Sequence, residues 1–212
     1  MKNILIFGMT ENPGGVESFL MSYIRKINRS KFKFGFLCNS YEKIAYEDEL
    51  ISYGCEIYHI TARSKDYKKY KREMQQFFKE HASKYDIIWV NVCSLANIDY
   101  LKYAKKYGIK RRIIHSHNSM NMDSKLRGLL HAYNKKNIEK YATDFWACSK
   151  EAGEWFYTQN GRKKEEYIII RNAIDFSRYR YNENKRDEYR KKFKVADKFV
   201  IGNVGRLQFQ KN

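Results

Sequence analysis

Residues 4–18 have the sequence ILIFGMTENPGGVES and indicate the fold most directly. Ile4–Phe7 form a short apolar run typical of a buried strand, and Val16–Ile27 then carry apolar residues at helical spacing. Between them, Gly14 and Gly15 allow a close turn in which backbone N–H groups at the helix start can face an anion. A turn without any ligand explains the two glycines equally well. Strand, glycine turn and helix together predict the first unit of a parallel α/β sheet.

The same alternation of short apolar runs and longer amphipathic segments continues along the chain. It predicts a doubly wound, mainly parallel sheet of the Rossmann-like kind, with right-handed crossovers and helices on both faces. The expected strands are Ile4–Phe7, Phe34–Cys38, Cys55–Ile60, Asp86–Asn91, Arg112–His115, Asp144–Cys148 and Tyr167–Arg171. The expected helices are Val16–Ile27, Tyr67–Phe78, Leu95–Tyr107, Asn184–Lys194 and one from Asp123 or Ser124 to Tyr141.

The pattern changes after Asp175. A highly charged helix is followed by Lys198–Arg206, which have the composition of another buried strand but no chain after them for a crossover. We therefore expect residues 1–180 to form the Rossmann-like domain and 181–197 a helical linker. Residues 198–212 are expected to be the first strand of a second domain in a longer protein.

The composition restricts the class of partner. The formal net charge of +18 favours an anionic partner such as an acidic bilayer or a phosphorylated substrate, although a solvated basic surface also explains it. The 18 tyrosines are not interleaved with the basic residues, so no nucleic-acid partner is expected. Four scattered cysteines predict buried reduced thiols, and the N-terminus lacks the pattern of a signal peptide. A cytoplasmic location is expected.

Ligands of doubly wound sheets bind at the carboxyl ends of the strands. The predicted fifth strand ends in His115, Ser116 and His117, and strand alternation places the two histidines on the same side. A histidine there can bind a sugar or phosphate or move a proton, and a structural role for at least one of them is equally open. A metal site would need a third ligand, which Asp123 or His131 would supply only by coincidence of folding. We expect no metal.

Two further turns follow predicted strands. Ser149 is placed to cap a helix, and Asn172 begins the turn Asn172–Asp175. Ordinary turn chemistry explains both. The glycine loop matches neither the dinucleotide nor the Walker pattern, and the chain contains no GxSxG motif of a hydrolase.

Taken together and in order, these segments resemble the retaining glycosyltransferases of family 4, which have the two-domain GT-B fold. The resemblance spans the whole chain and is closest to bacterial members that build capsular, exopolysaccharide or lipopolysaccharide chains. Each motif alone is weak, whereas five in the same order and spacing are quite specific. The motifs are Gly14–Glu17, His115–Asn118, Ala147–Ala152, Asn172–Asp175, and Val204–Leu207 with Gln210–Asn212.

The resemblance implies roles for individual residues. Gly14 and Gly15 would approach the donor diphosphate, and Arg206 and Lys211 would neutralise it in place of a metal ion. His117, with His115 as the alternative, would lie near the reacting sugar. Glu17, Asn118, Ser149 and Asn172 would lie on the acceptor side.

The implied partners are a nucleotide-sugar donor and a glycan or polyprenyl-diphosphate-linked acceptor, with no cofactor. A peripheral position at the inner face of an anionic cell membrane is a further expectation. The chain stops at Asn212, before the second acidic motif of the family and nearly all of its donor pocket. These 212 residues alone are therefore expected to be inactive.

Two alternatives remain open. A GT-B sugar-nucleotide epimerase shares the architecture but needs only a nucleotide sugar and water. A non-catalytic module that binds anionic glycans would use the basic surface without any reaction.

Overall fold

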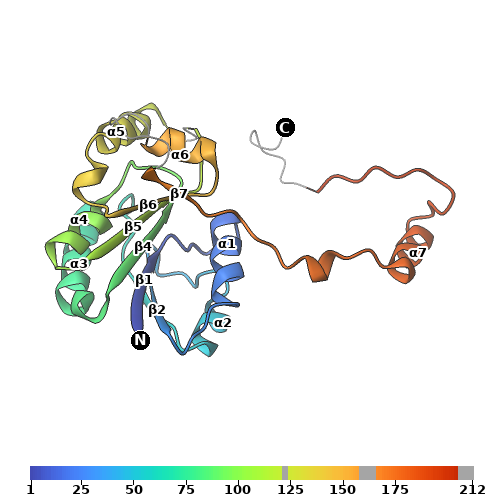
Figure 1. The fold of residues 1–212 in the computed structure, drawn as a ribbon, viewed down its shortest axis with the longest axis horizontal. Coiled ribbons are helices and arrows are strands. Elements are labelled where there is room, and N and C mark those ends of the chain that lie inside the picture. Colours follow the sequence, from blue (N-terminus) through green and yellow to red (C-terminus); the bar gives the residue numbers. More distant parts are fainter. Residues whose placement is uncertain (121–123, 158–165, 205–212) are drawn as a thin grey trace. The chain divides into compact units, whose positions relative to one another are not determined.

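The computed structural model describes residues 1–120, 124–157 and 166–204. Within these residues, seven parallel strands form one sheet in the order β3-β2-β1-β4-β5-β6-β7 (Figure 1). The predicted doubly wound α/β fold is confirmed. The strands are β1 (Lys2–Phe7), β2 (Phe32–Cys38), β3 (Glu56–His59), β4 (Ile87–Val92), β5 (Arg111–Ser116), β6 (Asp144–Ala147) and β7 (Ile168–Ile169).

The sheet is covered by helices on both faces, with α1 and α2 on one side and α3 and α4 on the other (Figure 1). Of the two residues predicted to cap α5, Asp123 and Ser124, Ser124 is the cap, because its hydroxyl accepts a hydrogen bond from the Arg127 N–H at 3.4 Å. The helices of this part are α1 (Gly15–Ile24), α2 (Glu47–Ser52), α3 (Tyr67–His81), α4 (Asp99–Lys106), α5 (Lys125–Lys135) and α6 (Lys150–Tyr157), with the short 3₁₀ helices η1 (Ala82–Lys84) and η2 (Ile138–Lys140).

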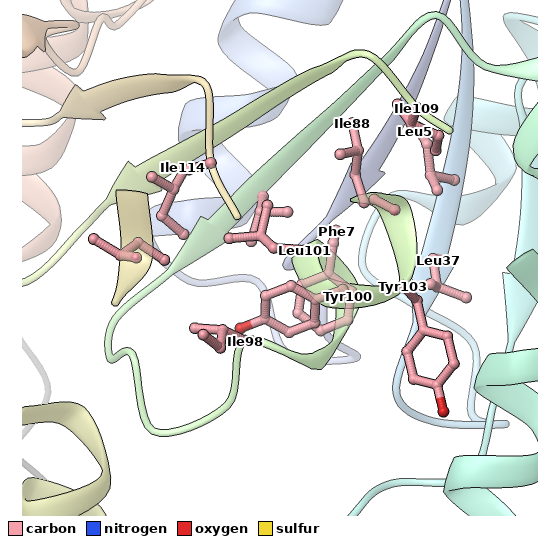
Figure 2. Close-up of a cluster of buried hydrophobic side chains, with 14 of the residues drawn as sticks. Leu5, Phe7, Leu37, Ile88, Ile98, Tyr100, Leu101, Tyr103, Ile109 and Ile114 are labelled. Carbon is pink, nitrogen blue, oxygen red and sulfur yellow. The ribbon is translucent and has the colours of Figure 1, made fainter. Parts of the chain in front are cut away.

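Strand alternation divides the core into two clusters. Leu5 and Phe7 of β1 point to the face that α3, α4 and α6 cover, and Figure 2 shows both in this cluster, with Leu5 beside Ile109. Ile4 and Ile6 point to the opposite face and pack with α1 and α2. A central strand with both faces buried is thus apolar at consecutive positions, as the sequence of β1 is.

Two expectations need correction. The strand predicted at Tyr167–Arg171 is limited to Ile168–Ile169, and both residues are exposed because β7 pairs only with β6 at the sheet edge. Not all cysteines are buried: Cys93 is exposed, because it lies in the loop after β4 instead of inside a strand.

The chain divides into a unit of residues Met1–Ile174 and a second unit that begins at Asp175. In the second unit, the 3₁₀ helix η4 spans Phe176–Tyr179 and α7 spans Glu183–Lys192, which confirms the charged helix. Residues 198–204 have no regular structure. The predicted domain boundaries and the first strand of a second domain stay predictions. No helix among the described residues has the length and apolar character needed to cross a bilayer.

Candidate functional site

The strand order reverses between β1 and β4, because β2 and β3 extend the sheet on one side of β1 and the later strands extend it on the other. In doubly wound sheets, ligands bind at this switch point, beyond the carboxyl ends of the two strands. Gly8 follows β1 with a φ of +125°, and a Cβ atom there would lie 2.2 Å from the Asn91 carbonyl oxygen. Glycine is therefore required for these two strand ends to approach each other.

The loop after β1 is held by Glu17, a buried residue of α1. The carboxylate accepts hydrogen bonds from the Thr10 N–H at 3.0 Å, the Thr10 hydroxyl at 2.7 Å and the Gly14 N–H at 3.0 Å. Because the Gly14 N–H is engaged in this way, it does not face a ligand in this structure. The N–H groups of Gly15, Val16 and Glu17, in the first turn of α1, precede the first intrahelical bond and can face an anion without breaking this network.

His117 lies directly after β5 and is fixed by Asn91 of β4. Its Nε2 lies 3.0 Å from Asn91 Oδ1, while Asn91 Nδ2 lies 3.4 Å from the carbonyl oxygens of Phe7 and Trp89. Because the Asn91 NH₂ group faces two acceptors, its Oδ1 faces the ring, and Nε2–H of His117 is the donor. The other ring nitrogen, Nδ1, is then unprotonated and can accept a hydrogen bond from a hydroxyl group.

Burial keeps His117 neutral. Desolvation lowers its pKa from 6.5 to about 4. Its ring lies 5.0 Å from the ring of Phe19, which brings the histidine beside α1 and the glycine loop. Sequence reasoning missed Asn91 as the partner of His117, because an amide inside an apolar strand does not reveal what it will contact.

His115 occupies a different environment. As predicted, it lies on the same side as His117, with ring centroids 4.2 Å apart, but it is fully buried. Its ring contacts those of Phe19, Trp89 and Trp146, and burial lowers its pKa to about 2. A side chain without exposed surface does not reach a ligand in this conformation, so the geometry favours His117, and the catalytic role of His115 stays a prediction.

The remaining predicted residues lie around this edge. Asn118 folds back on its own loop, with Nδ2 bonded to the Met120 carbonyl at 3.0 Å. The Ser149 hydroxyl accepts from the Ala152 N–H at 3.2 Å, which confirms its capping position on α6. Asn172 is exposed after β7. Arg206 and Lys211 lie outside the described residues.

Helix α1 also holds the segment that carries Asn172. The Ser22 hydroxyl donates to the Ala173 carbonyl at 2.9 Å, and the Tyr23 hydroxyl donates to the Arg171 carbonyl at 2.9 Å. The structure thereby brings the turn after β7 to the helix that begins at the glycine loop.

A cavity of about 590 Å³ opens at the carboxyl ends of β1 to β4, on the face opposite α1. Arg63 and Arg127 are its cationic side chains. The cavity lies at the carboxyl ends of the strands, where the doubly wound fold predicts a ligand, but the sequence did not indicate that α5 would complete its wall. The lining is Phe7, Asn39, Ala62, Arg63, Ser64, Val92, Cys93, Ser94, Ala96, Asn97, Tyr100, Arg127 and Leu130.

The described residues contain no group of three or more His, Cys, Asp or Glu side chains that could hold a metal ion. His131, one of the two conceivable third ligands, has its Nδ1 bonded to the Leu95 N–H at 3.0 Å. Asp123, the other, lies outside the described residues.

No protein-family model matches the chain. A curated protein of Bacillus subtilis (strain 168), provisionally named glycosyltransferase EpsF, is 26% identical over 208 residues, which are 95% of this chain and 53% of that protein. The chain thus spans about half the length of this relative.

Solved structures of two proteins are among those with a similar fold. Anabaena HepE, determined with UDP and with UDP and glucose, is 20% identical, with TM-scores of 0.69 and 0.70 over 98% of this chain and 54% of HepE. The lipopolysaccharide outer core galactosyltransferase WaaB is 17% identical, with a TM-score of 0.55 over 82% of this chain and 46% of WaaB. At these identities the similarity shows the fold: the α/β fold found in about half of each of these two proteins.

Proposed function

We propose that this chain is the acceptor-side half of a retaining, family 4-type glycosyltransferase. The full-length enzyme would transfer a sugar from a nucleotide-sugar donor to a polysaccharide or a lipid-linked acceptor during synthesis of a bacterial surface polysaccharide. The match to the Bacillus relative over 95% of the chain supports the enzyme class, and the bound UDP of HepE supports the class of donor.

One observation carries the proposal: a neutral histidine of fixed tautomer stands at the switch point beside the glycine loop. Asn91 binds Nε2–H of His117 at 3.0 Å and so leaves Nδ1 as an acceptor. An unprotonated nitrogen near the reacting sugar can orient a hydroxyl group and does not repel the positive charge that builds up on the sugar as the leaving group departs.

The charge on the other reacting group is negative. The departing nucleoside diphosphate would be stabilised by N–H groups at the start of α1, with Gly15 the first of them, and by Arg206 and Lys211. We propose that these two cations replace a metal ion. Glu17, Asn118, Ser149 and Asn172 would shape or contact the acceptor side.

A donor screen on the full-length protein tests the proposal, with release of nucleoside diphosphate as the readout and EDTA present to remove metal ions. Activity with one or more nucleotide sugars is expected, and His117→Ala should lower kcat by roughly 10²-fold or more. The matched control is His81→Asn, at the end of α3 and away from the switch point, which should keep the rate. Equal rates for His117→Ala and wild type would reject the role of this histidine.

The same assay separates the alternatives. An epimerase shares the fold and would convert the nucleotide sugar in water without an acceptor, so acceptor-independent turnover would favour it. If no nucleotide sugar reacts, a non-catalytic glycan-binding module is the better description.

A further inference from the structure

Helix α5 has its polar side turned inward. The Leu95 N–H donates to His131 Nδ1 at 3.0 Å, and Asn134 Nδ2 donates to the Leu95 carbonyl at 2.7 Å. Lys135 Nζ donates to the Trp155 carbonyl, and the His131 ring stacks on the Trp155 ring at 4.0 Å. All three polar side chains are buried. These bonds fix the rotation of the helix about its axis.

The apolar side of α5 therefore faces outward. Leu126, Leu129, Leu130 and Tyr133 follow the spacing of a single helical stripe, which in a soluble protein usually faces the core. Here Leu126, Leu129 and Tyr133 are 67%, 69% and 67% exposed, and Leu130 is 36% exposed. A contiguous exposed apolar stripe marks an interaction surface. We call these four residues the leucine stripe.

The charges around the leucine stripe have one sign. Residues 124–138 contain Lys125, Arg127, Lys135 and Lys136 and no aspartate or glutamate. Of the four, Lys125, Arg127 and Lys136 are exposed. Helical geometry places Lys125 and Lys136 along one border of the stripe and Arg127 along the other. An apolar stripe between cationic borders is the pattern of a helix that lies in the interface of an anionic bilayer.

We propose that the leucine stripe docks this domain on an anionic lipid bilayer, with α5 lying parallel to the membrane plane. Leucine side chains would enter the acyl boundary while the basic borders contact lipid headgroups. A second copy of the chain is a poorer occupant, because a two-fold contact through the stripe would bring the cationic borders of two α5 helices together.

The docking surface continues into the cavity at the carboxyl edge of the sheet. Arg127 and Leu130 belong to α5 and also line that cavity of about 590 Å³. A domain docked through α5 would therefore bring this wall of the cavity near the lipid surface, where, under the proposed function, a lipid-linked substrate has its headgroup. The docking itself does not depend on transfer activity, so it is tested without any sugar.

Vesicle co-sedimentation of the 212-residue chain is the first test, with phosphatidylcholine alone and phosphatidylcholine mixed with phosphatidylglycerol. Binding is expected only to the anionic vesicles. Leu126→Ser with Leu129→Ser should weaken that binding by roughly tenfold or more, because apolar area no longer leaves water. The single variant Ile51→Ser, at an exposed apolar residue of α2, is the control and should bind like wild type.

A matched pair of charge variants separates local contact from the overall charge. Replacing Lys125, Arg127 and Lys136 by glutamine should weaken binding by about fivefold for each residue. Replacing Lys68, Arg72 and Lys79, exposed residues of α3, removes the same charge from another surface. If both triple variants lose the same affinity, the bilayer does not recognise α5 and the proposal is wrong.

Insertion is tested by fluorescence with Leu129→Trp, whose emission should shift to the blue and be quenched by brominated acyl chains. Ile51→Trp should show neither effect. Unfolding midpoints within about 2 °C of wild type show that the exposed substitutions leave the fold intact. If wild type does not bind anionic vesicles, the proposal fails. A concentration-dependent dimer that the leucine variant abolishes would then assign the stripe to a second copy. Neither result would touch the proposed transfer reaction.

Discussion

Helices α3 and α5 are both amphipathic and lysine-rich, yet they use their apolar sides in opposite ways. In α3, Tyr70, Met74 and Phe78 are fully buried against the sheet. In α5, Leu126 and Leu129 are exposed, although their spacing is just as regular. Figure 1 shows α3 packed along the sheet, whereas α5 lies beyond the strand ends.

The comparison separates two properties of a helix: whether it has an apolar side, and whether that side faces the core. Apolar spacing shows that a helix has an apolar side, but it does not show where that side points. In α5 the direction is decided by polar contacts: His131 and Asn134 bind both backbone groups of Leu95. A buried carbonyl or N–H that loses its partner costs more than an exposed leucine, so the polar side turns inward.

The largest difference between the two helices should appear in core deletions. Phe78→Ala in α3 removes a side chain with no exposed surface and should lower the free energy of unfolding by about 3–5 kcal/mol. Chemical denaturation monitored by circular dichroism measures this. A loss below about 1 kcal/mol would mean that the apolar side of α3 is not part of the core.

A smaller difference should appear on acidification. Burial, with the nearby Lys135 charge as the second cause, lowers the pKa of His131 to about 4. In the unfolded chain this residue takes up its proton near pH 6.5, so stability should fall as the pH drops from about 6.5 to about 4.

His131→Asn keeps an acceptor for the Leu95 N–H and removes the titration. Between pH 6.5 and 4 it should therefore lose about 2 kcal/mol less than wild type, although His115 and His117 still titrate in both. Urea melts at several pH values provide the comparison. If the unfolding free energies of the variant and of wild type fell equally with pH, His131 would not be buried in its neutral form.

Breaking the polar attachment of α5 should have an intermediate effect. Asn134→Ala leaves the buried Leu95 carbonyl without its 2.7 Å donor and should cost about 1–2 kcal/mol. Asn172→Ala, at an exposed asparagine, is the control and should cost nothing measurable. Equal unfolding free energies for the two variants would contradict the inward polar side.

The smallest effect is expected on the exposed stripe. Leu129→Ser should change the free energy of unfolding by less than about 0.5 kcal/mol, since little apolar area is lost from the folded state. The same melts measure it. A loss above about 2 kcal/mol would place Leu129 in the core and remove the contrast with Phe78.

Most of the fold could be predicted because buried parallel strands are short apolar runs. All seven strands of the described residues were anticipated, each to within two residues at either end. Helix α2 was missed because Leu50 is its only buried residue, so it has no apolar repeat. At β7 the run Tyr167–Arg171 overstated the strand, since an edge strand needs fewer paired residues.

The sequence predicted those features of the candidate site that follow from the alternation of side chains along a strand. It did not predict the contacts between residues far apart in the sequence. His115 and His117 share a side because the strand continues between them. The hydrogen bond from His117 to Asn91 joins residues 26 positions apart, and no local pattern indicates it. The inward rotation of α5 likewise depends on Leu95, more than 30 residues before His131.

The carboxylate of Glu17 has a consequence for selectivity. It sits against the loop that precedes α1 and so places a resident negative charge where a small free anion would otherwise settle. A small anion such as chloride or inorganic phosphate would be repelled by this charge. A large ligand anchored elsewhere on the protein does not depend on this one contact. The carboxylate that holds the loop in shape therefore also lowers the affinity of this loop for a free anion, because the two negative charges repel each other.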